Sequence, residues 1–341
     1  MDMARIGPNL LVIIAVACSL LVGSCKRSGA SGGMQATVVP ERVKLFNSTA
    51  EVSHVVGELK GGDQVLVVSK VDEQGKNWVE VKAADGLTGW LDSRYLVNQD
   101  IVNQSQKLAE TLKDIPVQAS GRSKASLKLR LTPDRANDDN VAILLPQGTP
   151  LEIVARERRP RPALASDKEG DEAPSQKFDE WYEVRLKDNQ VLPAGWIYAG
   201  SVELDIPPEI VYYVSGARRI VAWQNLGNAH DNEGHAGDHF LVLERRVDGS
   251  DDTADFDRVK VLAYSPGSRD YYTPFREDLK GRFPVVTTIN GQRGVFKINT
   301  IDKDGNSKLM EYDIEIPVSG KVSVKKLTMT PHETTKLRKR R

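Results

Sequence analysis

A four-part pattern occurs twice in this chain and limits the fold more than any other feature of the sequence. The first copy reads VKLF, VVGELKGGDQVLVV, WVEV and GWLDSRYL, and the second reads LKLR, VAILLPQGTPLEIV, WYEV and GWIYAGSVEL. Both copies keep the same order and place a Gly-Trp pair near their end. Short, alternating apolar runs separated by Gly, Asp and Asn are typical of β-strands. The sequence therefore predicts a tandem duplication of one small β unit.

This order of features resembles the bacterial SH3 domain. The resemblance rests on Gly57, Gly62 with Asp63, Trp78, and the Gly89-Trp90 pair. It covers residues 36–98, and the second copy extends over residues 117–207. The resemblance implies two SH3-like barrels and ligands of the kind associated with bacterial SH3 domains, namely cell-wall peptides and envelope proteins. The ALYDY-type aromatic row with which eukaryotic SH3 domains bind Pro-rich peptides is absent from both copies.

The repeated aromatic residues have a structural interpretation and a functional one. A barrel of about 60 residues hides a small share of its surface and depends on a few large apolar side chains. Trp78 and Trp181 lie in alternating strands and are predicted to be core residues, and a structural role also comes first for the tryptophans that follow glycine. Because exposed aromatic residues beside loops hold extended ligands, some can line a groove. The candidate ligand-binding residues are Trp90, Tyr95, Trp196 and Tyr198.

Two segments interrupt the β pattern. Residues 99–116 carry Ile101, Leu108, Leu112 and Ile115 at helix-like spacing, which predicts a linker with a short helix. Inside the second copy, residues 156–178 are charged, contain proline and have little to bury, which predicts a mobile insertion loop.

The remaining sequence also favours β structure. Two prolines in DIPPEI mark a boundary, and residues 208–331 then hold eight short apolar segments, among them IVYYV, RRIVAW and PVVTTI. Short strands separated by polar turns predict an antiparallel β-sandwich. The expected fold class is therefore all-β, with two SH3-like barrels followed by a C-terminal β-sandwich.

The beginning of the chain has the pattern of an export signal. The apolar run Leu10–Val22 is shorter than the ~20 residues of a membrane-spanning helix and suits a signal-peptide core. The following residues, VGSC, resemble the lipobox of bacterial lipoproteins, in which the signal is removed before a cysteine whose sulfur is acylated. Residues 1–24 are thus predicted to be a signal peptide, residues 25–35 a flexible tether, and Cys25 the lipid-attachment site.

An uncleaved N-terminal anchor is the alternative. Asp2 offsets Arg5 before the apolar run, and Lys26 and Arg27 follow it on the side that would have to cross the membrane, against the usual charge bias.

Composition excludes several classes of function. The chain has 341 residues with 47 basic and 47 acidic side chains, so no overall field attracts nucleic acid. Of its two cysteines, Cys18 lies in the signal and Cys25 at the lipid site, which leaves none for a cysteine peptidase. Phosphate-binding glycine loops, G-x-S-x-G elbows and dinucleotide fingerprints are absent. Residues 332–341 form a basic tail that is predicted to be disordered, and no cofactor is expected.

Three histidines gather in one segment, NAHDNEGHAGDHF. His230, His235 and His239, with interleaved carboxylates, are ligand types that zinc prefers. Their spacings do not match the H-E-x-x-H motif, and glycine and asparagine favour a solvated loop. The metal-site interpretation is kept as the alternative.

These features together predict an exported, lipid-anchored protein without enzymatic activity. Its expected partners are the membrane, through the lipid, and a cell-wall peptide or envelope protein ligand, at the outer membrane or periplasmic face in a diderm cell. The alternative is a metal-dependent envelope hydrolase that uses the three histidines and is targeted by the barrels.

We expect mass spectrometry of the mature N-terminus to find a chain that begins at an acylated Cys25. Acylation contributes about 0.8 kcal/mol per buried methylene, so two or three chains hold a protein on a membrane. A native chain intact from Met1 and free of lipid would contradict this prediction.

Overall fold

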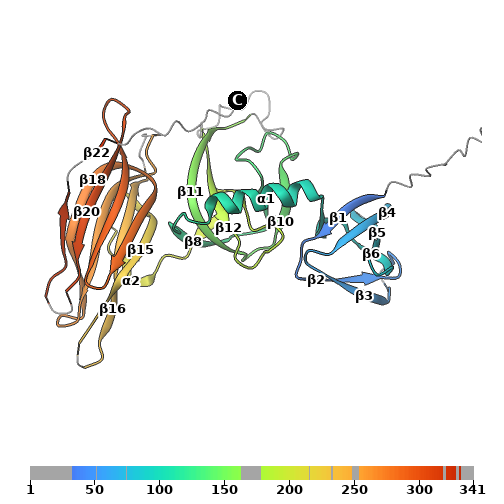
Figure 1. Cartoon of the computed structure of the whole chain (residues 1–341), viewed down its shortest axis with the longest axis horizontal. Coiled ribbons are helices and arrows are strands. Elements are labelled where there is room, and N and C mark those ends of the chain that lie inside the picture. Colours follow the sequence, from blue (N-terminus) through green and yellow to red (C-terminus); the bar gives the residue numbers. More distant parts are fainter. Residues whose placement is uncertain are drawn as a thin grey trace, which may run out of the picture. The chain divides into compact units, whose positions relative to one another are not determined.

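A computed structural model describes residues 33–331, except 51, 74, 163–177, 215, 232, 248–252, 318–319 and 328–329. The described chain is all-β and forms three antiparallel sheets, two of them curled into half-barrels (Figure 1). The predicted all-β class is confirmed, and the C-terminal part of the described chain forms one eight-stranded sheet. The predicted signal peptide, most of the tether with Cys25, and the basic tail lie outside the described residues.

The first half-barrel is a sheet of seven strands with the order β3-β2-β6-β5-β4-β1-β7. Its elements are β1 (Met34–Val38), β2 (Arg42–Phe46), β3 (Val55–Lys60), β4 (Gln64–Glu73), β5 (Lys76–Ala83), β6 (Thr88–Asp92), the 3-10 helix η1 (Ser93–Tyr95) and β7 (Leu96–Val97).

The second half-barrel repeats this topology, because its order is β10-β9-β13-β12-β11-β8-β14 and each strand number is raised by seven. Its elements are β8 (Ala119–Ser123), β9 (Leu127–Arg130), β10 (Val141–Leu145), β11 (Pro150–Pro160), β12 (Phe178–Arg185), β13 (Ala194–Tyr198), the 3-10 helix η2 (Ala199–Ser201) and β14 (Val202–Leu204). The repeat seen in the sequence is therefore also a repeat of strand order.

Matching residues close the two cores. Leu45 on β2 and Leu129 on β9 occupy the same place in the two copies, and both are fully buried. The same holds for two further pairs on the neighbouring strands. Those pairs are Val81 with Val184, and Leu91 with Ile197.

The glycine of each Gly-Trp pair allows two strands to approach closely. A Cβ atom on Gly89 would lie 3.0 Å from the Phe46 carbonyl oxygen. On Gly195 it would lie 2.9 Å from the Arg130 carbonyl oxygen and 2.6 Å from Leu129 Cδ1. The tryptophan that follows pairs with the same neighbouring strand, Trp90 with Phe46 and Trp196 with Arg130. Glycine is thus required where β6 and β13 cross β2 and β9.

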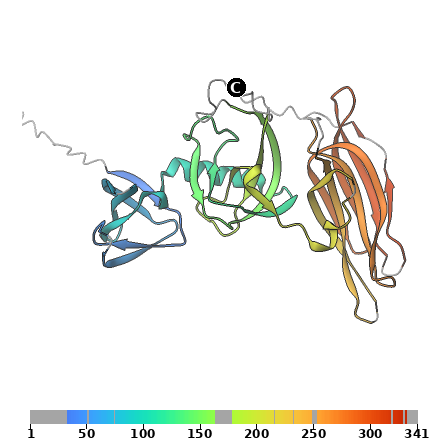
Figure 2. The same cartoon turned by 180° about the vertical axis from the view of Figure 1, so that it is seen from behind.

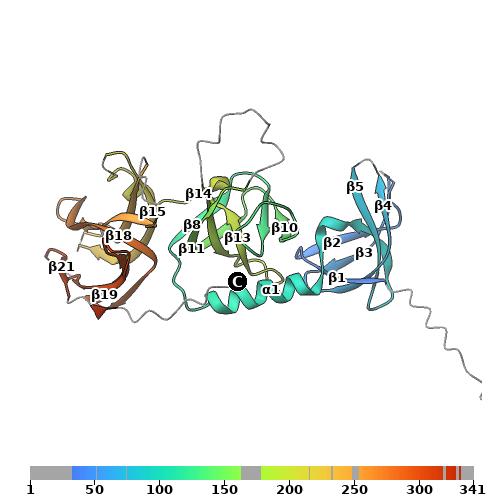
Figure 3. The same ribbon diagram turned by 90° about the horizontal axis from the view of Figure 1, so that it is seen from above.

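The predicted linker helix is α1 (Gln99–Leu112), and it packs on the second half-barrel (Figure 3). Asn98 caps its start by accepting a hydrogen bond from the Ile101 N–H at 2.8 Å. The Ser105 hydroxyl is buried, donates to the Ala194 carbonyl at 2.6 Å and accepts from the Ala194 N–H at 3.2 Å. Leu112 contacts Val154 and Ala194, so the apolar face of the helix completes the core.

The C-terminal sheet has eight strands that pair mainly in chain order (Figure 2). They are β15 (Arg218–His230), β16 (Ala236–Arg246), β17 (Phe256–Ser265), β18 (Asp270–Asn290), β19 (Arg293–Ile301), β20 (Ser307–Glu315), β21 (Ser323–Lys326) and β22 (Thr330–Pro331), which also pairs with β20. One face carries a core around Phe296 and Tyr312, and Phe240 belongs to a smaller cluster on the strands β15–β17.

Two local predictions were wrong. The segment IVYYV does not form a strand: α2 (Pro208–Val211) begins at a proline that suits the first helical turn, and Ile210 anchors it in the smaller cluster. The predicted insertion 156–178 is partly strand, because β11 continues to Pro160 and β12 starts at Phe178. Charged residues there pair across the strands, as Arg156 does with Glu180. Residues 163–177 lie outside the described residues.

Neither α1 nor any other helix within the described ranges is long and apolar enough to cross a bilayer.

We expect Gly195→Ala to destabilise the protein by about 1–3 kcal/mol, the usual cost of forcing an extra methyl group into a packed core. The urea midpoint, followed by tryptophan fluorescence, measures the effect. Gly267→Ala is the control, because a Cβ at Gly267 meets nothing within 4 Å. Equal midpoints for the two variants would contradict the close strand crossing.

Candidate functional site

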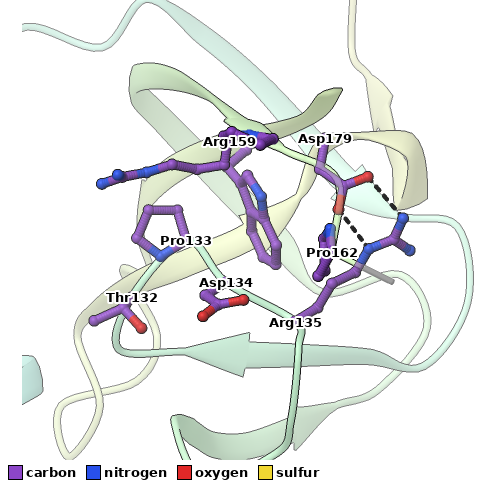
Figure 4. Close-up of a pocket in the computed structure, with 9 residues that line it drawn as sticks. Thr132, Pro133, Asp134, Arg135, Arg159, Pro162 and Asp179 are labelled. Atoms are coloured by element: carbon purple, nitrogen blue, oxygen red, sulfur yellow. Dashed lines mark hydrogen bonds and ion pairs between the residues drawn. The ribbon is translucent and has the colours of Figure 1, made fainter. Parts of the chain in front are cut away.

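A pocket of about 350 Å³ opens on the second half-barrel (Figure 4). Its walls come from the loop between β9 and β10, from the far end of β11 and from the start of β12. The lining residues are Thr132, Pro133, Asp134, Arg135, Arg159, Pro160, Pro162, Asp179 and Trp181.

Trp181 is the aromatic wall of the pocket. Only 1% of its surface is exposed, which confirms its predicted place in the core, whereas Trp78 at the matching position is half-buried. Among the described residues, the Trp181 Nε1–H has no hydrogen-bond partner. A buried donor without a partner costs about 1–3 kcal/mol and calls for an explanation.

A buried ion pair fixes the wall next to Trp181. Arg135 Nε and a terminal nitrogen each donate to one oxygen of Asp179 at 2.6 Å (Figure 4). Asp179 lies two residues before Trp181 on β12, and its side chain is 1% exposed. The Arg135 guanidinium also lies 4.6 Å from the centre of the Tyr198 ring, which meets Trp181 edge-on at 6.0 Å. Charge pairing and ring packing therefore hold Arg135 in place.

Hydrogen bonds also order the loop that forms the opposite wall. The Asn140 side-chain amide donates to the carbonyl oxygens of Thr132 at 3.0 Å and Asp134 at 2.9 Å. Arg130 donates to the Asn137 carbonyl at 2.7 Å and to Asp138 at 2.9 Å. A loop with these internal bonds presents its pocket residues in one arrangement, which lowers the entropic cost of binding.

The rim of the pocket carries both signs of charge. Asp134 is exposed and accepts a hydrogen bond from the Ala136 N–H at 2.8 Å through one of its two carboxylate oxygens. Arg159 is about half exposed, with 52% of its side chain accessible, and pairs with Glu157 at 2.8 Å. An aromatic wall between a carboxylate and a guanidinium suits a short peptide segment, which offers apolar, carbonyl and charged groups together.

The four aromatic candidates from the sequence do not share one groove. Trp90 is half-buried on β6, and Tyr95 packs against the first core with Arg94 over its ring at 5.3 Å. Trp196 is half-buried on β13. Tyr198 contacts both Arg135 and Trp181 and thus supports the pocket.

Sequence reasoning did not single out Arg135 or Asp179. Asp179 and Trp181 alternate in FDEWYEV, so a strand places both on one face. This spacing in the sequence is enough to place Asp179 on the same face of the strand as Trp181. Arg135 lies in a turn-rich loop, TPDRANDDN, and no local pattern points from it to Asp179, 44 positions away.

The three histidines lie in and beside the hairpin between β15 and β16. His230 is exposed, whereas His239 is buried, and its Nδ1 accepts the Tyr264 N–H at 3.0 Å. Burial lowers the pKa of His239 below its usual value. His235 Nδ1 lies 2.8 Å from an Asp231 oxygen.

One group with metal-ligand chemistry occurs among the described residues, and it differs from the predicted trio. Its members are Asp231, Glu233 and His235, whose ligand atoms lie within 4.8 Å of one another. The Asp231 carboxylate already accepts the N–H groups of Glu233 and His235 at 2.9 Å, so it caps the hairpin turn. This capping explains the group without an ion.

Comparison with known proteins does not assign this chain to a family. No protein-family model matches the sequence, and no curated protein matches it. Two solved structures from Trichomonas vaginalis can be aligned with most of the chain. NlpC2 has 9% sequence identity and a TM-score of 0.17, and the alignment covers 86% of this chain and 96% of NlpC2. NlpC1 has 8% sequence identity and a TM-score of 0.16, and the alignment covers 86% of this chain and 91% of NlpC1. Such low TM-scores support no conclusion about fold or function.

We expect Arg135→Met to destabilise the protein by about 3–5 kcal/mol, because it leaves the buried Asp179 carboxylate without its partner. The double variant Arg135→Met/Asp179→Leu removes both charges and should recover most of the loss. Urea unfolding of the wild type, both single variants and the double variant forms the cycle that measures the coupling. Additive losses would contradict the described pairing.

Proposed function

We propose that this protein is a lipid-anchored, non-enzymatic binding or scaffold protein of the cell envelope. In this proposal, the pocket of the second half-barrel binds a short peptide segment of the cell wall or of an envelope protein. The single observation that carries it is the pocket itself, in which the buried Trp181 lies between prolines and charges of both signs.

The size and chemistry of the pocket support a peptide ligand. Its volume of about 350 Å³ lies at the lower end of the range for small-molecule sites, roughly 300–1,000 Å³, and suits a few residues. Pro133, Pro160 and Pro162 give apolar walls without backbone donors, and Asp134 and Arg159 offer one acceptor and one donor at the rim. The walls are held by bonds already made in the unliganded protein, so little order has to be created on binding.

The sequence resemblances supply the envelope setting. The SH3-like order of both copies implies wall-peptide or envelope-protein ligands, and the lipobox around Cys25 implies attachment to a membrane. Two modules on one tether raise the effective concentration of each for a repetitive ligand such as the wall. Duplication is useful in this way even where each module binds weakly.

The test is retention of soluble wall peptides by the immobilised full-length protein in mild detergent. Asp134→Asn/Arg159→Gln should reduce retention at least about twofold, since exposed charge contacts contribute about 0.2–1 kcal/mol each. Solubilised envelope proteins are applied to a second set of columns, which separates the two ligand sources.

The matched control is Asp304→Asn/Arg293→Gln, which changes the same residue types at exposed positions of the C-terminal sheet. It should retain as much ligand as the wild type. Equal loss in the two double variants, or no retention of either ligand source by the wild type, would refute the pocket as the binding site.

A further inference from the structure

A second and larger cavity, of about 700 Å³, is lined by the start of β8 and the residues before it, by the helix α2 and by the strands β15, β16 and β18. It shares no residue with the pocket around Trp181. Its lining residues are Pro116, Val117, Ala119, Ser120, Pro207, Glu209, Trp223, Gln224, Asn225, Asp238, Phe240, Thr287 and Ile289.

The cavity combines an aromatic wall with acidic groups. Trp223 and Phe240 both belong to the cluster that α2 covers, where Ile210 is fully buried. Asp238 and Phe240 alternate along β16 and therefore share one face of the sheet. The buried anchor Ile210 places its neighbour Glu209 at the same cavity.

Both carboxylates line this cavity together with Trp223 and Phe240. Burial, followed by the charges of Glu209 and Asp238, raises the pKa of Tyr271 to about 12. Tyr271 packs on Phe240 with 6.4 Å between ring centres.

Neither carboxylate is neutralised within the described chain. Glu209 is exposed and Asp238 is half-buried, and no described cation forms an ion pair with either of them. None of the described lining residues is Lys, Arg or His. The cavity thus has a net negative charge, aromatic faces and no cation of its own.

We propose that this cavity binds a basic side chain, Lys or Arg, of an extended polypeptide segment. The cation lies between Glu209 and Asp238 and against the half-buried ring of Trp223, where charge pairing and cation–π attraction act together. The flanking peptide groups lie along Ser120 and Asn225, whose side chains offer hydrogen bonds.

The size of the cavity favours a peptide over a free amine. A volume of about 700 Å³ falls within the range of sites for drug-sized ligands and is far larger than one ammonium group needs. The apolar part of the lining, with Pro116, Pro207 and Ile289, suits the aliphatic stem of a basic side chain.

The test uses two pools of N-acetylated pentapeptide amides with random flanking residues, one with lysine and one with norleucine at the centre. Each pool is passed over the immobilised full-length protein in mild detergent. We expect the lysine pool to be retained at least about tenfold more than the norleucine pool. Glu209→Gln/Asp238→Asn should abolish this difference, because the amides keep the shape and remove the charge.

The matched control is Glu203→Gln/Asp304→Asn, which removes two exposed carboxylates that do not line the cavity. It should keep the tenfold preference, and circular dichroism should show that all variants are folded. Equal retention of the two pools by the wild type, or the same loss in the control, would overturn the inference. Neither outcome bears on the pocket around Trp181, which has its own variants.

Discussion

The close crossing of two strand pairs is the constraint on which both half-barrels depend. β6 passes β2, and β13 passes β9, so closely that a methyl group at Gly89 or Gly195 would meet backbone oxygen at about 3 Å. The crossing joins neighbouring strands inside each curled sheet, and apolar residues of these strands form part of the buried core of each half-barrel.

The two copies share this frame but differ in what covers the first of their two repeated tryptophan positions. In the first copy Trp78 is half-buried and packs edge-on against Phe46 at 6.1 Å. In the second copy the buried pair of Arg135 and Asp179 stands beside Trp181, and the far end of β11 and the start of β12 contribute further residues to the wall. A frame with fixed strand order can therefore gain a pocket through changes in one loop and one hairpin, without altering its core.

The sequence predicted those parts of the fold that depend on local pattern. Alternating apolar residues identified the strands of both copies, and the spacing of Leu108 and Leu112 identified α1. The prediction of a strand at IVYYV was wrong because a helix of four residues is too short to show helical periodicity. The sequence predicted only part of β18, because Pro274 and Pro284 are residues that usually interrupt a strand. In the structure, both prolines lie at irregularities of the strand pairing, where a missing N–H is tolerated. The pocket escaped prediction because Arg135 and Asp179 meet only through the fold.

The seating of α1 has a consequence for how this chain can be divided or recombined. A helix between two repeats is easily taken for a neutral spacer, yet Ser105 bonds both backbone groups of Ala194, and Leu112 fills the core beneath β13. The second repeat is therefore a unit that starts at Asn98. A gene fragment that begins after the helix would encode a second half-barrel whose core lacks the cover of α1. Any natural recombination of this module therefore has to include the helix.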